Sequence, residues 1–186
     1  MRLFMLLMLL PTWAHAQPVA INPASIAGYI RADLGGGPEP ENVLLVYDNE
    51  GAIDLYIYTR SLNSGVFRAP EIYVPGFAYS TRNPPVLRLL LPDKSFTVLV
   101  NQSSGLGASA FATRIAYRNG AFRIIGMLDE FYPNTGEGVR RCAYDLERGL
   151  ASFTAISGEV VEISTDVAPL PLDGDLPNTL TEYCVD

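Results

Sequence analysis

The Asn119-Gly120 dipeptide constrains the fold of this chain more than any other feature of its sequence. Asn-Gly favours a two-residue type I′ turn, because both central positions of that turn require positive φ. Segments of alternating character flank the dipeptide, and a two-residue loop fixes their register. Tyr117 is then expected opposite Phe122, and Phe111 opposite Leu128. We therefore predict a half-buried antiparallel hairpin at the centre of the chain.

The two faces of this hairpin differ in character. One face is aromatic and branched aliphatic, as expected of a buried face. The other carries Arg114, Arg118 and Arg123 with alanines between them. Forked guanidinium groups could hold an anionic ligand, so these arginines form a possible ligand face. The alternative is a solvated face that pairs with nearby carboxylates.

Further short apolar runs are separated by turn signals along most of the chain. They predict strands at 43–47, 54–60, 66–74, 86–91, 96–101, 139–146, 150–156 and 160–164. Pro70 places its strand at an edge or a bulge, and Pro75-Gly76 predicts the start of an irregular loop. This spacing is typical of an all-β, antiparallel meander that closes as a barrel, a sandwich or a propeller-like sheet.

The N-terminal residues 1–16 have the organisation of a signal peptide. Arg2 precedes the apolar run LFMLLMLL, and Ala14-His15-Ala16 is an A-x-A cleavage site. The apolar run is too short to span a bilayer. We expect cleavage after Ala16, export to the periplasm or beyond, and no membrane insertion.

The mature chain is expected to have three parts. Residues 17–40 would form a short helix, starting at Asn22 or Pro23, followed by a Gly/Pro linker. An apolar stripe at Ile26, Tyr29, Ile30 and Leu34 supports that helix. Residues 41–166 would form the antiparallel β domain, and residues 167–186 an irregular tail.

Cleavage also changes the chemistry that the chain can perform. It removes the only His, the only Trp and Arg2, and leaves 12 basic against 20 acidic residues, a net charge of −8. This acidity opposes binding to nucleic acid or anionic lipid. Without His, neither a Ser-His-Asp nor a Cys-His site can form, and Lys94 is the only lysine. We expect no cofactor and no enzyme activity.

A hydrolase that uses paired carboxylates has no local signature, so this alternative stays open. Asp129, Glu130 and Glu137 are its candidates by proximity, with solubilising loop residues as the alternative reading.

Cys142 and Cys184 are the only cysteines, and we predict a disulfide between them in the oxidising compartment. The bond would tie the tail to a core strand. Two free thiols are the alternative, but no His is left to lower a thiol pKa.

The loop that starts at Asp48 resembles the calcium loop of integrin-type propeller repeats, D-x-[DN]-x-D-G-x-x-D-L. Asp48, Glu50 and Asp54 would supply oxygen ligands. Val46 occupies the first ligand position and the loop is not repeated, so an acidic turn without metal is the preferred reading.

The segment 117–126, YRNGAFRIIG, resembles the hairpin Y-R-N-G-x-F-x-L-I-G of uncharacterised secreted bacterial proteins. There, acidic residues, a T-G-E turn and a Y-x-L-x-T-G strand end follow. The matching pieces here are Asp129-Glu130, 135–137 and 144–149, with Arg148 where the pattern usually has Thr. The resemblance covers about the central quarter of the chain. It implies an exported all-β module and carries no functional residue.

Together these features predict an exported, non-catalytic binding or accessory module. Its partner would be a protein or small ligand of the cell envelope, and we expect a monomer. One alternative is an inhibitor or immunity protein against a cell-wall hydrolase, since many such hydrolases are basic and opposite charge speeds encounter. The other is the carboxylate-dependent glycan hydrolase.

Overall fold

The computed structural model describes residues 21–48, 50–59, 70–79, 84–90 and 93–172. These residues form twelve β-strands and one turn of 3-10 helix. All strand pairings among them are antiparallel, and most strands pair with the next strand along the chain. The prediction of an all-β antiparallel meander is therefore confirmed.

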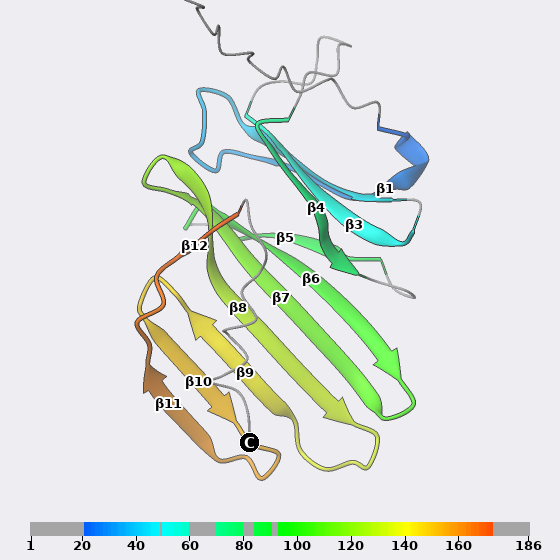
Figure 1. The fold of residues 1–186 in the computed structure, drawn as a ribbon, viewed down its shortest axis with the longest axis vertical. Coiled ribbons are helices and arrows are strands. Elements are labelled where there is room, and N and C mark those ends of the chain that lie inside the picture. The colour runs from blue at the N-terminus through cyan, green and yellow to red at the C-terminus, as the bar shows by residue number, and fades with distance from the viewer. Residues whose placement is uncertain (1–20, 49, 60–69, 80–83, 91–92, 173–186) are drawn as a thin grey trace, which may run out of the picture.

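The strands form two sheets (Figure 1). The smaller sheet has the order β1 (Ile26–Ala32), β2 (Glu41–Tyr47), β3 (Ala52–Tyr58) and β4 (Ile72–Tyr79). The larger sheet runs in chain order through β5 (Val86–Leu90), β6 (Ser95–Ser104), β7 (Gly107–Arg118), β8 (Ala121–Pro133), β9 (Arg140–Asp145), β10 (Leu150–Thr154) and β11 (Val160–Ser164). A short β12 (Leu170–Pro171) pairs with β8 beside this path. Within the described residues both sheets are open, and neither closes as a barrel.

One hydrophobic cluster joins the two sheets. The smaller sheet contributes Val43, Leu45, Ile53, Leu55 and Ile57, all 0% exposed, and the larger sheet contributes Phe96, Val98, Ile115, Ile124, Cys142, Tyr144 and Ala151. Because side chains alternate along a strand, these residues define the inner face of each sheet. Burial of this many large apolar side chains is the main stabilising contribution to the fold.

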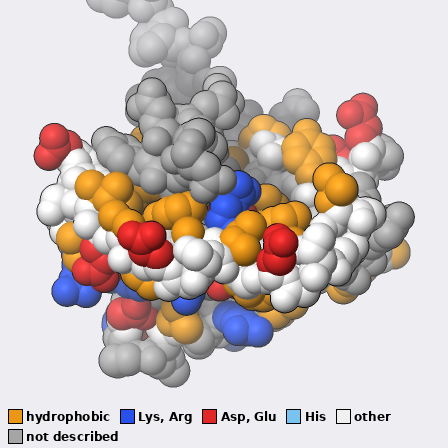
Figure 2. Space-filling view, turned by 90° about the horizontal axis from the view of Figure 1, so that it is seen from below, with side chains coloured by type: hydrophobic (Ala, Val, Ile, Leu, Met, Phe, Trp, Pro, Cys, Tyr) orange, Lys and Arg blue, Asp and Glu red, His pale blue; other side chains and the backbone are white. Residues whose placement is uncertain are grey.

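The larger sheet is longer than the smaller one. In Figure 1 the smaller sheet lies over one end of the larger sheet, and strands β6 to β11 extend beyond the smaller sheet. Viewed from that free end, hydrophobic side chains line a hollow between the two sides of the molecule, with basic atoms among them (Figure 2). Part of the inner face of the larger sheet therefore has no partner layer from the smaller sheet.

The predicted N-terminal helix is wrong. Asn22 does begin a helical turn, and its side chain accepts a hydrogen bond from the Ala24 N–H at 3.0 Å, but the turn ends at Ser25. Ile26–Ala32 is strand β1, which pairs with β2. The apolar spacing fits a helix locally, but strand pairing places Ile30 and Ala32 against the core and Tyr29 outside. The non-local hydrogen bonds of the sheet outweigh a weak helical preference.

Pro75-Gly76 lies within β4 and does not start an irregular loop as predicted. The register between β3 and β4 shifts here, and Gly76 has a φ of 58°. Phe77 follows the irregularity and is 8% exposed in the core. A bulge on an edge strand accommodates proline, because the missing N–H interrupts no ladder bond there.

The central hairpin has the predicted turn but not the whole predicted register. Asn119 and Gly120 have φ values of 52° and 84°, and Tyr117 pairs with Phe122 as expected. A bulge at Ile125 then shifts the register by one residue, so that Phe111 lies opposite Asp129 and not Leu128. A one-residue shift moves each following side chain to the other face. Asp129 thus joins the inner face.

No helix formed by the described residues is long and apolar enough to cross a membrane.

Candidate ligand-binding site

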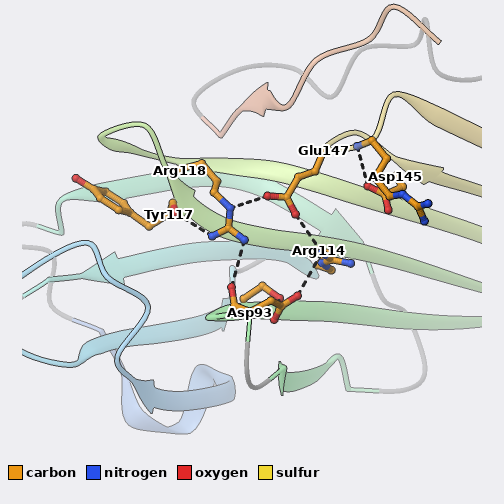
Figure 3. Close-up of polar contacts among 8 residues, drawn as sticks. Asp93, Arg114, Tyr117, Arg118, Asp145 and Glu147 are labelled. Atoms are coloured by element: carbon orange, nitrogen blue, oxygen red, sulfur yellow. Dashed lines mark hydrogen bonds and ion pairs between the residues drawn. The ribbon is translucent and has the colours of Figure 1, made fainter. Parts of the chain in front are cut away.

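Two arginines of the predicted row, Arg114 and Arg118, are paired with carboxylates (Figure 3). Arg118 Nε donates to Glu147 Oε1 at 2.6 Å, and Arg114 lies 3.2 Å from Glu147 Oε2. Arg114 also lies 3.2 Å from the carboxylate of Asp93. Asp93 comes from the turn between β5 and β6, and Glu147 from the turn between β9 and β10. Two turns distant in sequence therefore neutralise two neighbouring arginines.

This pairing bears on the anion-binding hypothesis. Two guanidinium groups and two carboxylates make a cluster with no net charge, and the side chains involved are about one-third exposed. Arg118 also donates to the main-chain oxygens of Tyr117 and Asp93. Arg123, the third predicted residue, pairs with Ala116 and Pro171 in the sheet. Arg114 and Arg118 therefore fit the alternative interpretation, a solvated face whose arginines pair with nearby carboxylates.

In the loop that resembles a calcium site, the carboxylates of Asp48 and Asp54 accept hydrogen bonds from groups of the same chain. Asp48 Oδ1 accepts hydrogen bonds from the N–H groups of Glu50 and Ala52, at 2.7 and 2.8 Å, and so closes the hairpin loop. Asp54, which is 9% exposed, accepts from Tyr73 Oη at 3.0 Å and from the Gly76 N–H at 2.8 Å. Glu50 is exposed to solvent.

The buried Asp54 carboxylate has a structural explanation. The β4 bulge frees the Gly76 N–H from the ladder, and Asp54 accepts it. Burial raises the pKa of Tyr73 and of Tyr56, and the negative charge of Asp54 raises both further. Both phenols therefore stay protonated as donors at neutral pH. Among the described residues, no group of three acidic, His or Cys side chains is placed to hold a metal ion.

The three carboxylates considered for hydrolysis do not converge. Asp129 and Glu130 are neighbours on β8, so their side chains point to opposite faces of the sheet. Glu130 lies on the outer face, 3.2 Å from Arg141, and accepts a hydrogen bond from Tyr132. Glu137 is exposed in the connection between β8 and β9. A paired-carboxylate mechanism needs two carboxyl groups on one site, which these residues do not form.

The uncovered part of the larger sheet gathers a different set of residues. Cross-strand partners share a face, so Asp129, paired with Phe111 and with the core residue Cys142, lies on the inner side. Phe153 pairs with Cys142, and Val161 pairs with Phe153. We name this surface the open inner face and define it by Phe111, Asp129, Arg140, Phe153, Val161 and Ile163.

Large apolar side chains on this face remain accessible. Phe111 is 41% exposed, Val161 43% and Ile163 39%. They come from β7 and β11, on either side of the half-buried Phe153. Several accessible apolar side chains on the same face of a sheet are typical of an interaction site rather than of scattered exposed residues.

Asp129 and Arg140 are the charged members of the open inner face. Burial raises the pKa of the Asp129 carboxyl, while the positive charge of Arg140 opposes this shift. The Arg140 guanidinium lies 5.9 Å from the centre of the Phe131 ring, within the range of a cation–π contact. The face therefore combines an apolar surface with one acidic and one basic group.

The sequence predicted Asp129 as a candidate hydrolase carboxylate or a solubilising loop residue, and Arg140 was not among the predicted site residues. The bulge at Ile125 decides the orientation of Asp129, and the adjacent Gly126, a glycine inside a strand pattern, was the available signal for that bulge. Arg140 pairs with Phe131 and lies on the inner side, whereas Arg141 lies on the outer side. The alternation of Arg140 with Cys142 was the available signal.

Cys142 lies on the same side and is 5% exposed. This agrees with the predicted core side of its strand. Cys184 lies outside the described residues, so the disulfide between them stays a prediction.

No protein-family model, no curated protein and no solved structure matches this chain. The geometry of its own residues therefore carries the proposal that follows.

Proposed function

We propose that the protein is an exported, non-catalytic binding module whose ligand binds the open inner face. The ligand would be a small amphipathic molecule. Its apolar part would lie over Phe111, Phe153 and Val161, and its polar end would meet Asp129 and Arg140. The exposure of large apolar side chains on one face of the larger sheet is the observation that carries this proposal.

The alternatives have less support. Arg114 and Arg118 of the arginine row are paired with Asp93 and Glu147, which compensates their charge and does not favour binding of an anion there. Asp129 and Glu130 point to opposite faces, which does not favour a carboxylate-dependent hydrolase. A binding role needs only apolar area and a few polar groups that orient the ligand, and the open inner face has both.

A titration with anilinonaphthalene sulfonate, an anionic amphipathic probe, tests the site. Its fluorescence should rise on binding to the mature protein, and Val161→Asp should weaken binding about tenfold or more, because a charge replaces apolar contact area. Val160→Asp is the matched control. Val160 is the same residue type on the same strand and is 59% exposed, but it faces the outer side.

Equal binding by both variants would show that the probe does not occupy the open inner face. If Val161→Asp alone weakens binding of the probe, a competing ligand from the cell envelope can be sought by displacement of the probe, with Val161→Asp as the negative control.

Export of the protein can be tested separately by intact mass spectrometry. The protein recovered from the periplasm should have an intact mass that begins at Gln17, or at its cyclised form. A mass that still includes residues 1–16 would contradict cleavage after Ala16, and absence of the protein from the periplasm would contradict export.

A further inference from the structure

The last described residue lies inside the molecule. Leu170 and Pro171 pair with Ile124 and Arg123 of β8, and Leu172 is 3% exposed in the cluster between the sheets. The part of the chain that the structure describes therefore ends between the two sheets, and fourteen residues follow it in the sequence.

Cys142 lies on the same inner side and pairs with Asp129 of β8. β12 runs antiparallel to β8, so Leu172 lies toward Phe122, and the direction from Leu172 to Cys142 is opposite to that of β12. The seven residues of strand from Phe122 to Asp129 extend over about 23 Å. The twelve residues from Leu172 to Cys184 can extend over about 40 Å. Cys184 can therefore reach Cys142 with enough chain left to lie along the sheet.

The composition of the segment fits the face that it would meet. Residues 173–186 include Leu176, Leu180, Tyr183 and Val185, and they contain acidic residues but no Lys or Arg. The open inner face offers accessible Phe111, Val161 and Ile163, together with the positive charge of Arg140. Both the segment and the open inner face thus have apolar area, and the acidic residues of the segment have a charge opposite to that of Arg140.

We propose that residues 173–186 bind along the open inner face of their own chain, held there by a bond between Cys142 and Cys184. In an antiparallel arrangement Asp186, two residues after Cys184, lies beside Arg140, two residues before Cys142. The segment is then an intramolecular occupant that a ligand of this face displaces in part. This last step rests on the proposed function, whereas the position of the segment does not.

Bond formation needs an oxidant. The two Sγ atoms join, each thiol gives up its proton, and the pair transfers two electrons to a disulfide-bonded oxidoreductase of the export compartment, which becomes a dithiol. Reduction reverses this exchange and frees the segment from its covalent link.

Photo-crosslinking in the exported protein tests the position of the segment. Phe153→p-benzoylphenylalanine places the crosslinker on the inner side of β10, beside Cys142, and changes one aromatic side chain into another. Thr154→p-benzoylphenylalanine is the matched control, because Thr154 follows on the same strand and faces the outer side. Peptide mapping identifies the residues joined.

We expect the crosslinker at position 153 to form adducts with residues 173–186. These adducts should be lost when the protein is reduced, and the crosslinker at position 154 should form none. Absence of these adducts from position 153, or equal yields from both positions, would overturn the proposal. If a crosslinker variant fails to fold, amide hydrogen exchange of residues 140–144 and 150–154 in the wild-type protein serves as the test instead. Exchange there should increase on reduction in the wild type but not in Cys184→Ser.

Probe titration separates this inference from the proposed function. Adducts without any effect of Val161→Asp on the probe would mean that the segment occupies the face and that the face is not the ligand site. Probe binding that depends on Val161, without adducts, would mean the reverse. If both hold, reduction should tighten the binding of the probe.

Discussion

Glu41 is a fully buried carboxylate with a structural role. It is 0% exposed, and its two oxygens accept hydrogen bonds from the N–H groups of Leu34, at 2.7 Å, and Gly36, at 2.6 Å. It thereby holds the loop that connects β1 to β2, where the sequence predicted only a linker. The Gly-rich loop has few side chains to pack, so this carboxylate replaces them as its anchor.

We predict that Glu41→Ala lowers the free energy of unfolding by about 2–4 kcal/mol, because a hydrogen bond to a charged group contributes about 1.5–3 kcal/mol and two N–H groups lose their acceptor. Urea denaturation measures this. Glu50→Ala, at an exposed turn position, is the control and should change stability by less than about 0.5 kcal/mol. Equal effects of the two substitutions would contradict the anchoring role.

Asp129 should make stability depend on pH. Its folded-state pKa is raised by burial, so the folded protein loses stability as the pH rises through that pKa. Although burial of the carboxyl raises its pKa, Asp129 as a whole residue is exposed to solvent, which screens the effect. We therefore predict that Asp129→Asn is more stable than the wild type at pH 7 by less than about 1 kcal/mol. The gain should vanish below about pH 4, where the unfolded-state carboxyl is protonated as well.

Glu130→Gln is the control for this comparison. Glu130 faces the outer side and pairs with Arg141, so its substitution should not stabilise the protein at any pH. A gain at pH 7 in both variants would point to net charge and not to the inner position of Asp129.

At the scale of single elements, the type I′ turn shows local backbone preference most directly. Gly120 has a φ of 84° with no heavy atom near the position of a Cβ, so strain alone decides the effect of a side chain. We predict that Gly120→Ala lowers the free energy of unfolding by about 1–2 kcal/mol, because a left-handed conformation disfavours Cβ by that amount. Gly105→Ala is the control in chemical denaturation, since it has equal space and no positive φ, and it should have little effect.

The ion pair of Arg118 and Glu147 ties two elements of the larger sheet together. We predict a coupling free energy of about 0.5–1 kcal/mol from a double-mutant cycle, because the side chains are only partly exposed and the bond is short. The coupling should fall in 1 M salt, where charges are screened over about 3 Å. The pair of Lys94 and Asp33, 52% and 63% exposed, is the control, with coupling near zero. Equal coupling in both pairs would contradict an effect of burial.

At the scale of the whole molecule, the predicted disulfide joins the end of the chain to the middle of the larger sheet. We predict that reduction lowers the melting temperature without loss of the β-sheet signal in circular dichroism. In the chain-entropy model a bond closing a loop of this span is worth on the order of 4 kcal/mol, less any strain. Cys184→Ser should melt as the reduced protein does and should not respond to reductant. Full unfolding on reduction would show that the sheets need the bond to form.

The features that follow from neighbouring residues were predictable from the sequence. Asn119-Gly120 specifies its turn because the required φ values belong to those two residues. Alternation predicted the strands for the same reason, since side-chain direction has a period of two in any strand. The core side of the β9 strand, with Cys142 and Tyr144, followed from that period alone.

Tertiary structure decided the features that depend on distant partners. Ile26–Ala32 becomes a strand because β2 offers hydrogen bonds that no local pattern records. The bulge at Ile125 turns Asp129 inward, and with it defines the candidate site. The positive charges of Arg114 and Arg118 are compensated by ion pairs with Asp93 and Glu147, which lie in turns distant in the sequence. Local sequence determines the conformation of a turn or strand, whereas the open inner face arises only where two sheets of unequal length pack together.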